Sequence, residues 1–491
     1  MSGVEEKAIR GIPWTFLTLA GSRLVQIAAT VVLARLLVPE DFGLVALALT
    51  ISIFLGLVAS LGLGGVYVVT QDLDEREQGT YLTMFLAMGA GFAVLMAALS
   101  PLAARAFAEP RLDEIVLGLS VMVFFSGGLN WFYEALMQRE LEFRNRFAAQ
   151  MVQAVTYAGT GIVLAALGAG VWSLVAGQIA AAAAYAVALL ALAPYRVRPA
   201  WDRAAAAEGV RGGSGFLVQT VTGFAAQNVD ILVVGRVLGA ARLGFYSMAV
   251  RLCELPTWFV AESVAKVTFP AFARMRHRGE DVTPAFLSAL KLVAFVTCPL
   301  GILLSGGAEP IALVVFGEQW AGMIGPLAVL GIWAAVKPVR NTTAWLLNSI
   351  GHQRILGRIS LAMLVLLVPT VYVAARAGGI AEVAWVVLGE SVLATAVLAW
   401  FARTRAGVSL ASQRRALTPV VLACPAAWLA CRGAAEAAAG SVGVLELGVP
   451  LVAGLAAYLA VIALVDPGLP RYALGQARRM VGRTTLAAPA A

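Results

Sequence analysis

Charged residues are scarce in this sequence of 491 residues: Asp, Glu, Lys and Arg make up 13% of it, whereas hydrophobic residues make up 60%. A soluble domain carries about 25% charged residues. With a mean hydropathy of +0.85, the chain lacks the polar surface that a soluble protein of this length needs. Its solvent must largely be lipid, where a spanning helix takes about 20 mostly apolar residues.

Residues that bind metals or form disulfides are also few. The four cysteines all lie within apolar stretches, where a free thiol behaves as a small apolar residue, and the two histidines lie in basic connecting segments. We therefore expect no cofactor, metal or disulfide. The sequence also lacks the glycine-rich loop ending in Lys-Ser or Lys-Thr that cradles nucleotide phosphates, which excludes nucleotide hydrolysis by that route.

The excess of eight positive charges is scattered among apolar segments rather than gathered in one patch. This scatter argues against nucleic acid as a partner and for a phospholipid bilayer. The first ten residues are polar, and no small-residue cleavage site follows the first apolar stretch. We therefore expect no cleavable signal peptide.

Apolar blocks separated by charged or turn-rich breaks predict an all-α polytopic membrane protein with about 14 transmembrane helices. The block at 322–350 is long enough to include a re-entrant start. The predicted spans are 13–33, 42–64, 80–104, 114–136, 147–168, 171–193, 210–234, 243–272, 285–306, 322–350, 357–375, 380–402, 416–432 and 443–465.

The distribution of cations predicts the orientation of these spans. With the N-terminus inside, the cytoplasmic segments hold 23 Lys and Arg residues and the opposite side holds seven. Cytoplasmic loops carry such an excess. Because the predicted number of spans is even, both termini are expected in the cytoplasm.

An internal repeat relates two parts of the chain that lie 201 residues apart. Shifted by that length, the 27 positions from Ser22 contain six identities, which is more than this composition gives by chance. The repeat places the first predicted helix over the seventh, so the two units run in the same direction. It predicts two parallel six-helix lobes around a central cavity, an architecture found in transporters, with two extra C-terminal helices.

Four stretches of sequence resemble a known family. They are Ala34-Arg35-Leu36-Leu37-Val38-Pro39-Glu40-Asp41-Phe42-Gly43, Leu238-Gly239 through Gly244-Phe245-Tyr246, Phe269-Pro270-Ala271-Phe272-Ala273-Arg274, and Phe316-Gly317-Glu318-Gln319-Trp320. About residues 10–405 are similar to polysaccharide exporters and oligosaccharide flippases (Wzx-type) of the multidrug/oligosaccharidyl-lipid/polysaccharide export superfamily. These stretches are structural turns, so they identify the family better than the substrate.

The resemblance implies a flippase of the bacterial inner membrane that works by alternating access. Its cargo is expected to be an undecaprenyl-diphosphate-linked glycan for O-antigen, capsule or exopolysaccharide, and a polysaccharide polymerase is an expected partner. The predicted domains are an N-lobe at 1–194, a cytoplasmic linker at 195–209, a C-lobe at 210–405, extra helices at 406–465 and a basic tail at 466–491.

Polar and ionisable residues inside predicted spans are the candidate functional residues, because such groups cost free energy in lipid unless a cavity or a partner solvates them. Arginine forks suit phosphate oxygens, and tryptophan faces suit sugar rings. We predict that substrate is bound by Arg23, Gln26, Arg251, Trp258, Lys266, Lys337, Arg340, Asn341 and Trp345. For ion coupling, with a proton or a sodium ion, the candidates are Asp230, Glu254 and Glu262.

Each assignment has a structural alternative. On a regular helix, the residues from Arg251 to Lys266 share one face, but Glu254 and Glu262 could equally neutralise cations within a helix contact. Asp230 could be a hydrogen-bonded helix-packing carboxyl. Lys291 lies close to a predicted cytoplasmic end, where a lysine snorkels to the head groups.

Two other functions remain open from the sequence. A cation-coupled multidrug exporter of the same superfamily would have an acid-dominated cavity, whereas the candidate residues here tilt basic. An integral membrane glycosyltransferase, polymerase or ligase usually carries a large external loop, and the predicted external connections here are short. We therefore expect a transporter and not an enzyme.

Overall fold

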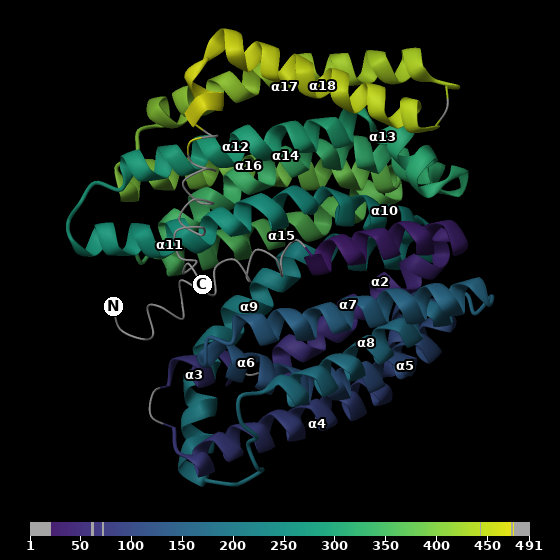
Figure 1. Cartoon of the computed structure of the whole chain (residues 1–491), viewed down its shortest axis with the longest axis vertical. Coiled ribbons are helices and arrows are strands. Elements are labelled where there is room, and N and C mark those ends of the chain that lie inside the picture. The colour runs from purple at the N-terminus through teal and green to yellow at the C-terminus, as the bar shows by residue number, and fades with distance from the viewer. Residues whose placement is uncertain (1–20, 60–62, 71–72, 442, 473–474, 476–491) are drawn as a thin grey trace, which may run out of the picture. The chain divides into compact units, whose positions relative to one another are not determined.

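Every element of the computed structural model is a helix within the described residues, which are all except 1–20, 60–62, 71–72, 442, 473–474 and 476–491 (Figure 1). The expectation of an all-α protein is confirmed. Eleven of the helices found among these residues are long and apolar enough to cross a membrane. The chain is therefore a multi-pass membrane protein, and the count of fourteen spans stays a prediction.

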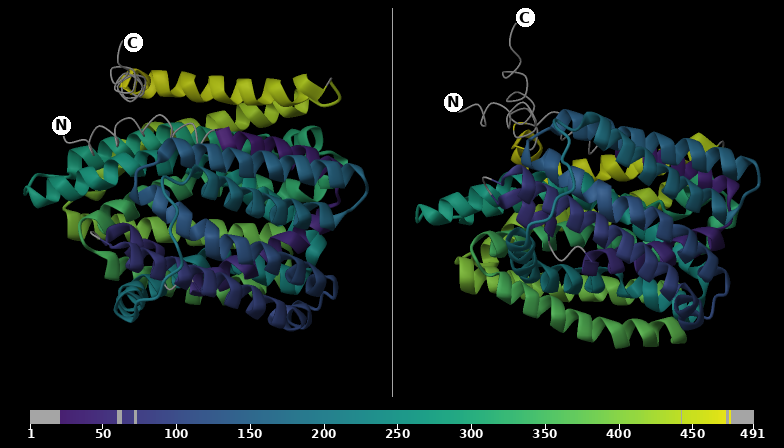
Figure 2. Two further views of the ribbon diagram at one scale, coloured as in Figure 1. Left: turned by 60° about the horizontal axis from the view of Figure 1, so that its bottom comes forward. Right: turned by 90° about the horizontal axis from the view of Figure 1, so that it is seen from below.

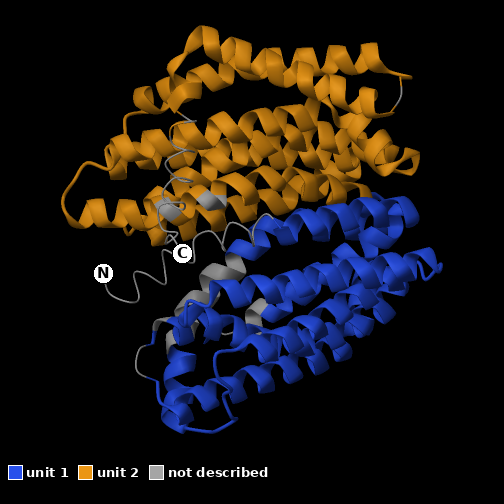
Figure 3. Ribbon diagram, in the orientation of Figure 1, with its two compact units in different colours: residues 1–244, 484–491 blue, residues 245–483 orange. Residues whose placement is uncertain are grey.

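The chain divides into two compact units, residues 1–244 and residues 245–483 (Figure 3). The boundary lies inside the predicted C-lobe at 210–405, and the lobe limits stay a prediction. α10 (Ala240–Cys253) begins in unit 1 and continues into unit 2.

Unit 1 is a bundle in which α4 packs on α5, α7 on α8, and α2 on α9. Its core joins α3, α4, α6 and α8 through buried aromatic residues that include Tyr67, Phe85 and Phe132. Its elements are a helix over 21–36, α2 (Pro39–Ala59), α3 (Leu63–Val69), α4 (Glu75–Phe107), α5 (Arg111–Phe125), the π-helix η1 (Ser126–Asn130), α6 (Trp131–Arg139), α7 (Phe143–Ala166), α8 (Val171–Leu192) and α9 (Arg203–Leu238).

Capping side chains explain where two of these helices begin. At α4, Asp74 accepts a hydrogen bond from the N–H of Glu77, whose side chain accepts one from the N–H of Asp74, which satisfies two end groups. At α9, Asp202 accepts hydrogen bonds from the N–H groups of Ala204 and Ala205. These hydrogen bonds, of which the one from Ala205 has the larger effect, hold the pKa of the Asp202 carboxyl below its ordinary value. α9 therefore begins inside the predicted linker at 195–209.

The segment before α9 is a strap along the start of α4. Thr83 donates a hydrogen bond to the carbonyl of Ala200 at 2.9 Å, and the N–H of Asp202 donates one to Thr80 at 2.8 Å. The Arg76 guanidinium donates to the carbonyl of Trp201. Residues 198–202 thus lie against the start of α4, in the same unit.

The two turns of the 201-residue repeat meet within unit 1. A Cβ placed on Gly43 would lie 1.8 Å from the carbonyl oxygen of Ala240, and one on Gly244 would lie 1.8 Å from that of Pro39. Only glycine permits so close a backbone approach. The repeat shift relates Pro39 to Ala240 and Gly43 to Gly244, so the two contacts are equivalent.

Unit 2 is built around α12, which packs on α14 and α17, while α14 also packs on α16. α17 and α18 lie side by side (Figures 1 and 2). The elements are the π-helix η2 (Thr257–Ala261), α11 (Glu262–His277), α12 (Thr283–Gly306), α13 (Ala308–Pro310), the π-helix η3 (Ile311–Phe316), the 3-10 helix η4 (Glu318–Met323), α14 (Ile324–Ser349), α15 (Gln353–Ala377), α16 (Ile380–Ala406), α17 (Leu410–Ala438) and α18 (Gly443–Val465).

Two glycines bring α12 and α14 together. A Cβ on Gly301 would lie 2.6 Å from both the Ala335 nitrogen and the Gly331 oxygen, and one on Gly331 would lie 2.5 Å from the Ser305 nitrogen. Small residues allow this close packing between membrane helices. It fixes the middle of α14, which carries the candidate site.

The predicted helix at 42–64 covers most of α2, which is described as far as Ala59, and the start of α3, which is described from Leu63. Positions 60–62 of that prediction lie outside the described residues. The block predicted at 322–350 begins within η4, a 3-10 turn that leads into α14.

Candidate functional site

α14 carries two cations inside a span. Lys337 and Arg340 are three residues apart, so they lie on neighbouring positions of one helix face. Pro338 stands between them and has no N–H to donate to the preceding turn. Their side chains are mostly buried, with 7% of Lys337 and 18% of Arg340 exposed. Buried cations of this kind need partners.

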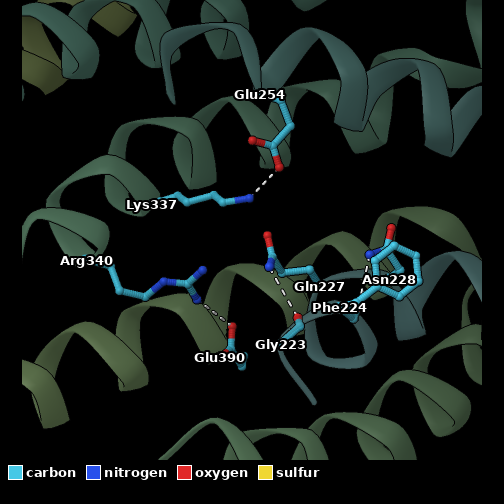
Figure 4. A network of polar contacts seen from close by, with 8 residues as sticks. All are labelled: Gly223, Phe224, Gln227, Asn228, Glu254, Lys337, Arg340 and Glu390. Carbon is cyan, nitrogen blue, oxygen red and sulfur yellow. Dashed lines mark hydrogen bonds and ion pairs between the residues drawn. The ribbon is translucent and has the colours of Figure 1, made fainter. Parts of the chain in front are cut away.

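Glu254 is the partner of Lys337. Their carboxylate and ammonium form an ion pair and a hydrogen bond (Figure 4). The Lys337 nitrogen also lies 4.5 Å from the ring centre of Trp333. A cation over a tryptophan face is attracted by the ring. The pair joins a predicted substrate-binding residue, Lys337, to a predicted ion-coupling residue, Glu254, and both roles stay predictions.

Glu390 is the partner of Arg340. A nitrogen of the guanidinium lies 3.2 Å from a carboxylate oxygen of Glu390, which comes from α16 and is itself 15% exposed. Figure 4 shows Lys337 and Arg340 extending from α14, with Glu254 and Glu390 at their tips. Sequence reasoning missed Glu390, although an acid in an otherwise apolar predicted span is the same signal that selected Glu254.

Irregular backbone surrounds Glu254. It follows α10, precedes Pro256, and is succeeded by the π-helix η2. Such π-helical turns occur frequently at functional sites. A π turn also shifts the helical register, so the single face predicted for the residues from Arg251 to Lys266 does not continue through η2.

The other candidates near η2 differ in their environment. Arg251 and Lys266 are exposed on the surface of the chain, and Trp258 is half-buried. The side chain of Glu262 lies outside the described residues. Within this group, Glu254 forms an ion pair with Lys337 of α14.

The candidates of unit 1 lie on two helices. The Arg23 guanidinium donates a hydrogen bond to the side-chain oxygen of Gln26 at 3.4 Å, one turn along the helix over 21–36. Asp230 is buried in α9. Its assignment to ion coupling stays a prediction.

The remaining two candidates lie further along α14. Asn341 is half-buried, and Trp345 packs against the apolar core that α12 and α17 share. A tryptophan in that core offers less of its ring to a sugar than the prediction requires. Its assignment as a substrate residue stays a prediction.

Other ion pairs lie away from Lys337. Lys291 contacts Asp466, just beyond the end of α18, at 3.2 Å, with about a third of each side chain exposed. Lys291 itself lies inside α12, and its snorkelling interpretation stays a prediction. Among the described residues, no group of three His, Cys, Asp or Glu is placed to hold a metal ion.

The paired charges of α14 define what the site can do chemically. The two cations and two carboxylates sum to zero, so these four side chains balance one another in charge. An anionic ligand with two phosphate groups matches the two adjacent cations, because charge-assisted hydrogen bonds from Arg and Lys to phosphate are strong. The ligand would have to displace the carboxylates to reach them.

Comparison with known sequences gives consistent matches. The family model described as "Polysaccharide biosynthesis protein" matches residues 32–325, more than half of the chain. The succinoglycan biosynthesis transport protein ExoT of Rhizobium meliloti is 26% identical over 347 residues, which are 71% of this chain and 70% of that protein. The lipopolysaccharide biosynthesis protein WzxC of Escherichia coli is 24% identical over 386 residues, which are 77% of each.

Comparison with solved structures identifies the fold. A lipid II flippase MurJ in an inward closed conformation superposes with a TM-score of 0.77 at 13% identity, covering 93% of this chain and 99% of that one. An inward-facing multidrug resistance MATE family transporter of the MOP superfamily gives a TM-score of 0.62 at 18% identity, covering 79% and 94%. The fold of this chain is thus similar to the folds of these two proteins.

Proposed function

Because this chain belongs to the family of polysaccharide biosynthesis proteins, we propose that it is a flippase for lipid-linked oligosaccharide. In this proposal it moves an undecaprenyl-diphosphate-linked repeat unit from the cytoplasmic to the outer leaflet of the bacterial inner membrane by alternating access. It catalyses no covalent step. A polysaccharide polymerase would receive the cargo on the outer side.

The observation that carries the proposal is the pair of adjacent buried cations on α14. Lys337 and Arg340 lie in α14, which is long and apolar enough to span a membrane, and each forms an ion pair with a carboxylate from another part of unit 2. Charged groups at membrane depth are expensive, so they mark substrate or ion pathways. Two cations one turn apart suit a diphosphate, which is the part of the cargo that every glycan of this class would share.

The relatives support the same substrate class. Their names concern succinoglycan transport, teichuronic acid biosynthesis and lipopolysaccharide biosynthesis. These polymers differ in their sugars, so the feature that a common transporter would recognise is the lipid diphosphate. The fold likeness to a lipid II flippase agrees with cargo that is a glycan on a lipid carrier.

The finer architecture is part of the proposal. We infer fourteen spans, two six-helix lobes with two extra helices, and both termini in the cytoplasm. The equivalent contacts of Gly43 with Ala240 and of Gly244 with Pro39 support the repeat on which the two lobes rest. The helices over 21–36, 203–238 and 240–277 are not among the eleven apolar candidates, and they carry eight of the twelve predicted site residues.

One observation favours a cation-coupled multidrug exporter as a second candidate. With Glu390 included, the α14 site is balanced in charge and does not tilt basic. A carboxylate freed from its cation could bind a cationic drug. Loss of resistance to cationic dyes on deletion, with surface glycan intact, would select this candidate.

Deletion of the gene tests the proposed function. We expect lipid-linked oligosaccharide to accumulate on the cytoplasmic face and surface glycan to disappear, while extracts of the deletion strain still extend and polymerise the glycan. Expression of the full chain from a plasmid should restore the surface glycan. Extracts that can no longer polymerise would instead identify an enzyme.

A further inference from the structure

Each cation of the α14 site is held by a carboxylate from a different element. Glu254, between α10 and η2, contacts Lys337, and Glu390, on α16, contacts Arg340 at 3.2 Å. None of the four side chains is more than 18% exposed. The site therefore consists of two closed ion pairs, side by side on three parts of unit 2.

An unpaired cation in such a place has two costs. It loses its hydration without compensation, which destabilises the folded protein. It would also attract a diphosphate in a medium of low effective dielectric, where charge–charge interactions are much stronger than in water. A transporter must release its cargo in every cycle, so cations without competitors would bind the cargo too firmly.

We propose that Glu254 and Glu390 are release residues, which compete with the diphosphate of the cargo for Lys337 and Arg340. When cargo enters, its phosphate oxygens take the two cations from the carboxylates. When cargo leaves, the carboxylates take them back, and this exchange offsets much of the cost of breaking the phosphate contacts. The inference rests on the proposed function, because it needs a cargo with a diphosphate.

A release role and a purely structural role for these carboxylates predict opposite changes in diphosphate binding when a carboxylate is removed. If Glu390 only holds Arg340 in position, its removal loosens the guanidinium and weakens binding. If Glu390 competes with the cargo, its removal strengthens binding and slows export. Glutamine tests the difference because it keeps the shape and hydrogen bonding of glutamate while it removes the charge.

Binding and export are measured together on the full chain. The protein is reconstituted in lipid nanodiscs, and its affinity is measured for undecaprenyl diphosphate, with undecaprenyl monophosphate as the comparison lipid. We expect Glu390→Gln and Glu254→Gln each to bind the diphosphate about tenfold more tightly than the unchanged protein. Both variants should lower surface glycan in cells in which they replace the unchanged protein.

Two controls accompany these variants. Glu382→Gln changes an exposed acid in the first turn of α16 and should leave binding and export unchanged. Arg340→Gln combined with Glu390→Gln removes the cation together with its competitor, and should bind the diphosphate more weakly than Glu390→Gln alone. Thermal melting of each variant shows that it is folded.

The outcomes separate the release role from the proposed function. Unchanged or weaker diphosphate binding by both Glu390→Gln and Glu254→Gln, with binding and export by the unchanged protein, would overturn the release role alone. Failure of the unchanged protein to bind undecaprenyl diphosphate, together with normal surface glycan in the deletion strain, would overturn the proposed function and the release role with it.

Discussion

Gly43 packs directly on the backbone of Ala240, with so little space that a Cβ at position 43 would lie 1.8 Å from the carbonyl oxygen. The contact of Gly244 with Pro39 repeats it at the same distance, 201 residues further along the chain. The turns that carry the family resemblance therefore contact each other as equivalent partners. The repeat that appears in the sequence as six identities thus appears in the structure as a pair of equivalent contacts.

These two glycines should be equally intolerant of substitution. Gly43→Ala and Gly244→Ala each force a methyl group against a carbonyl, so we expect each to lower stability by about 1–3 kcal/mol or more. Thermal melting of the purified protein measures the change. Gly159→Ala, on α7 where nothing lies within 4 Å, should melt at or above the temperature of the unchanged protein. Normal melting of Gly43→Ala would contradict the close contact.

Removing Lys337 should cost more than removing another paired lysine. Lys337→Ala leaves the mostly buried carboxylate of Glu254 without its cation, and breaking a buried pair costs about 3–5 kcal/mol. Lys291→Ala breaks a more exposed pair, worth about 0–1 kcal/mol. The double variant Lys337→Ala, Glu254→Ala should recover part of the loss in a thermal melt. A double variant less stable than Lys337→Ala would show that the pair is not the source of the cost.

Exchange of lysine for arginine should slow export. The chain has 32 arginines and four lysines, and three of those lysines lie in predicted spans. Arginine binds phosphate with two parallel hydrogen bonds, whereas lysine is a point charge. We expect Lys337→Arg to retain substrate and reduce surface glycan, and Lys266→Ala with Lys337→Ala to abolish it. Full export by that double variant would contradict the assignment of these lysines.

Reporter fusions should test the predicted orientation. Fusions after Arg203, Arg278 and Gly475 should report cytoplasm, because the cation-rich segments are predicted to lie inside. Fusions near Arg111 and Arg376 should report the outside. An external signal after Gly475 would mean that one of the last two spans has been assigned wrongly.

The limits of a helix were predictable where charged or turn-forming residues border an apolar block at both ends. The predicted span at 443–465 has the same limits as α18, and that at 171–193 differs from α8 by one residue. Charged stretches were harder, because α9 extends to Arg203 through residues that composition assigned to a linker. The cap at Asp202, rather than hydropathy, sets that boundary.

The site was only partly predictable, for a physical reason. Ionisable residues inside predicted spans can be found from the sequence, and Lys337, Arg340 and Glu254 were predicted in this way. Which of them meet depends on the packing of α14 with its neighbours and on the π turn of η2, which breaks the regular 3.6-residue period. Trp345 illustrates the same limit, since helix packing directs it to the apolar core.

The strap at 198–202 has a consequence for dividing the gene into two co-expressed halves. A cut after α8 would leave the second polypeptide to find α4 without a covalent connection, through the hydrogen bonds of Ala200, Trp201 and Asp202. A cut after Asp202 would separate α9 from the residue that caps it. The exposed turn at 278–281, between α11 and α12, offers a break that removes neither set of bonds.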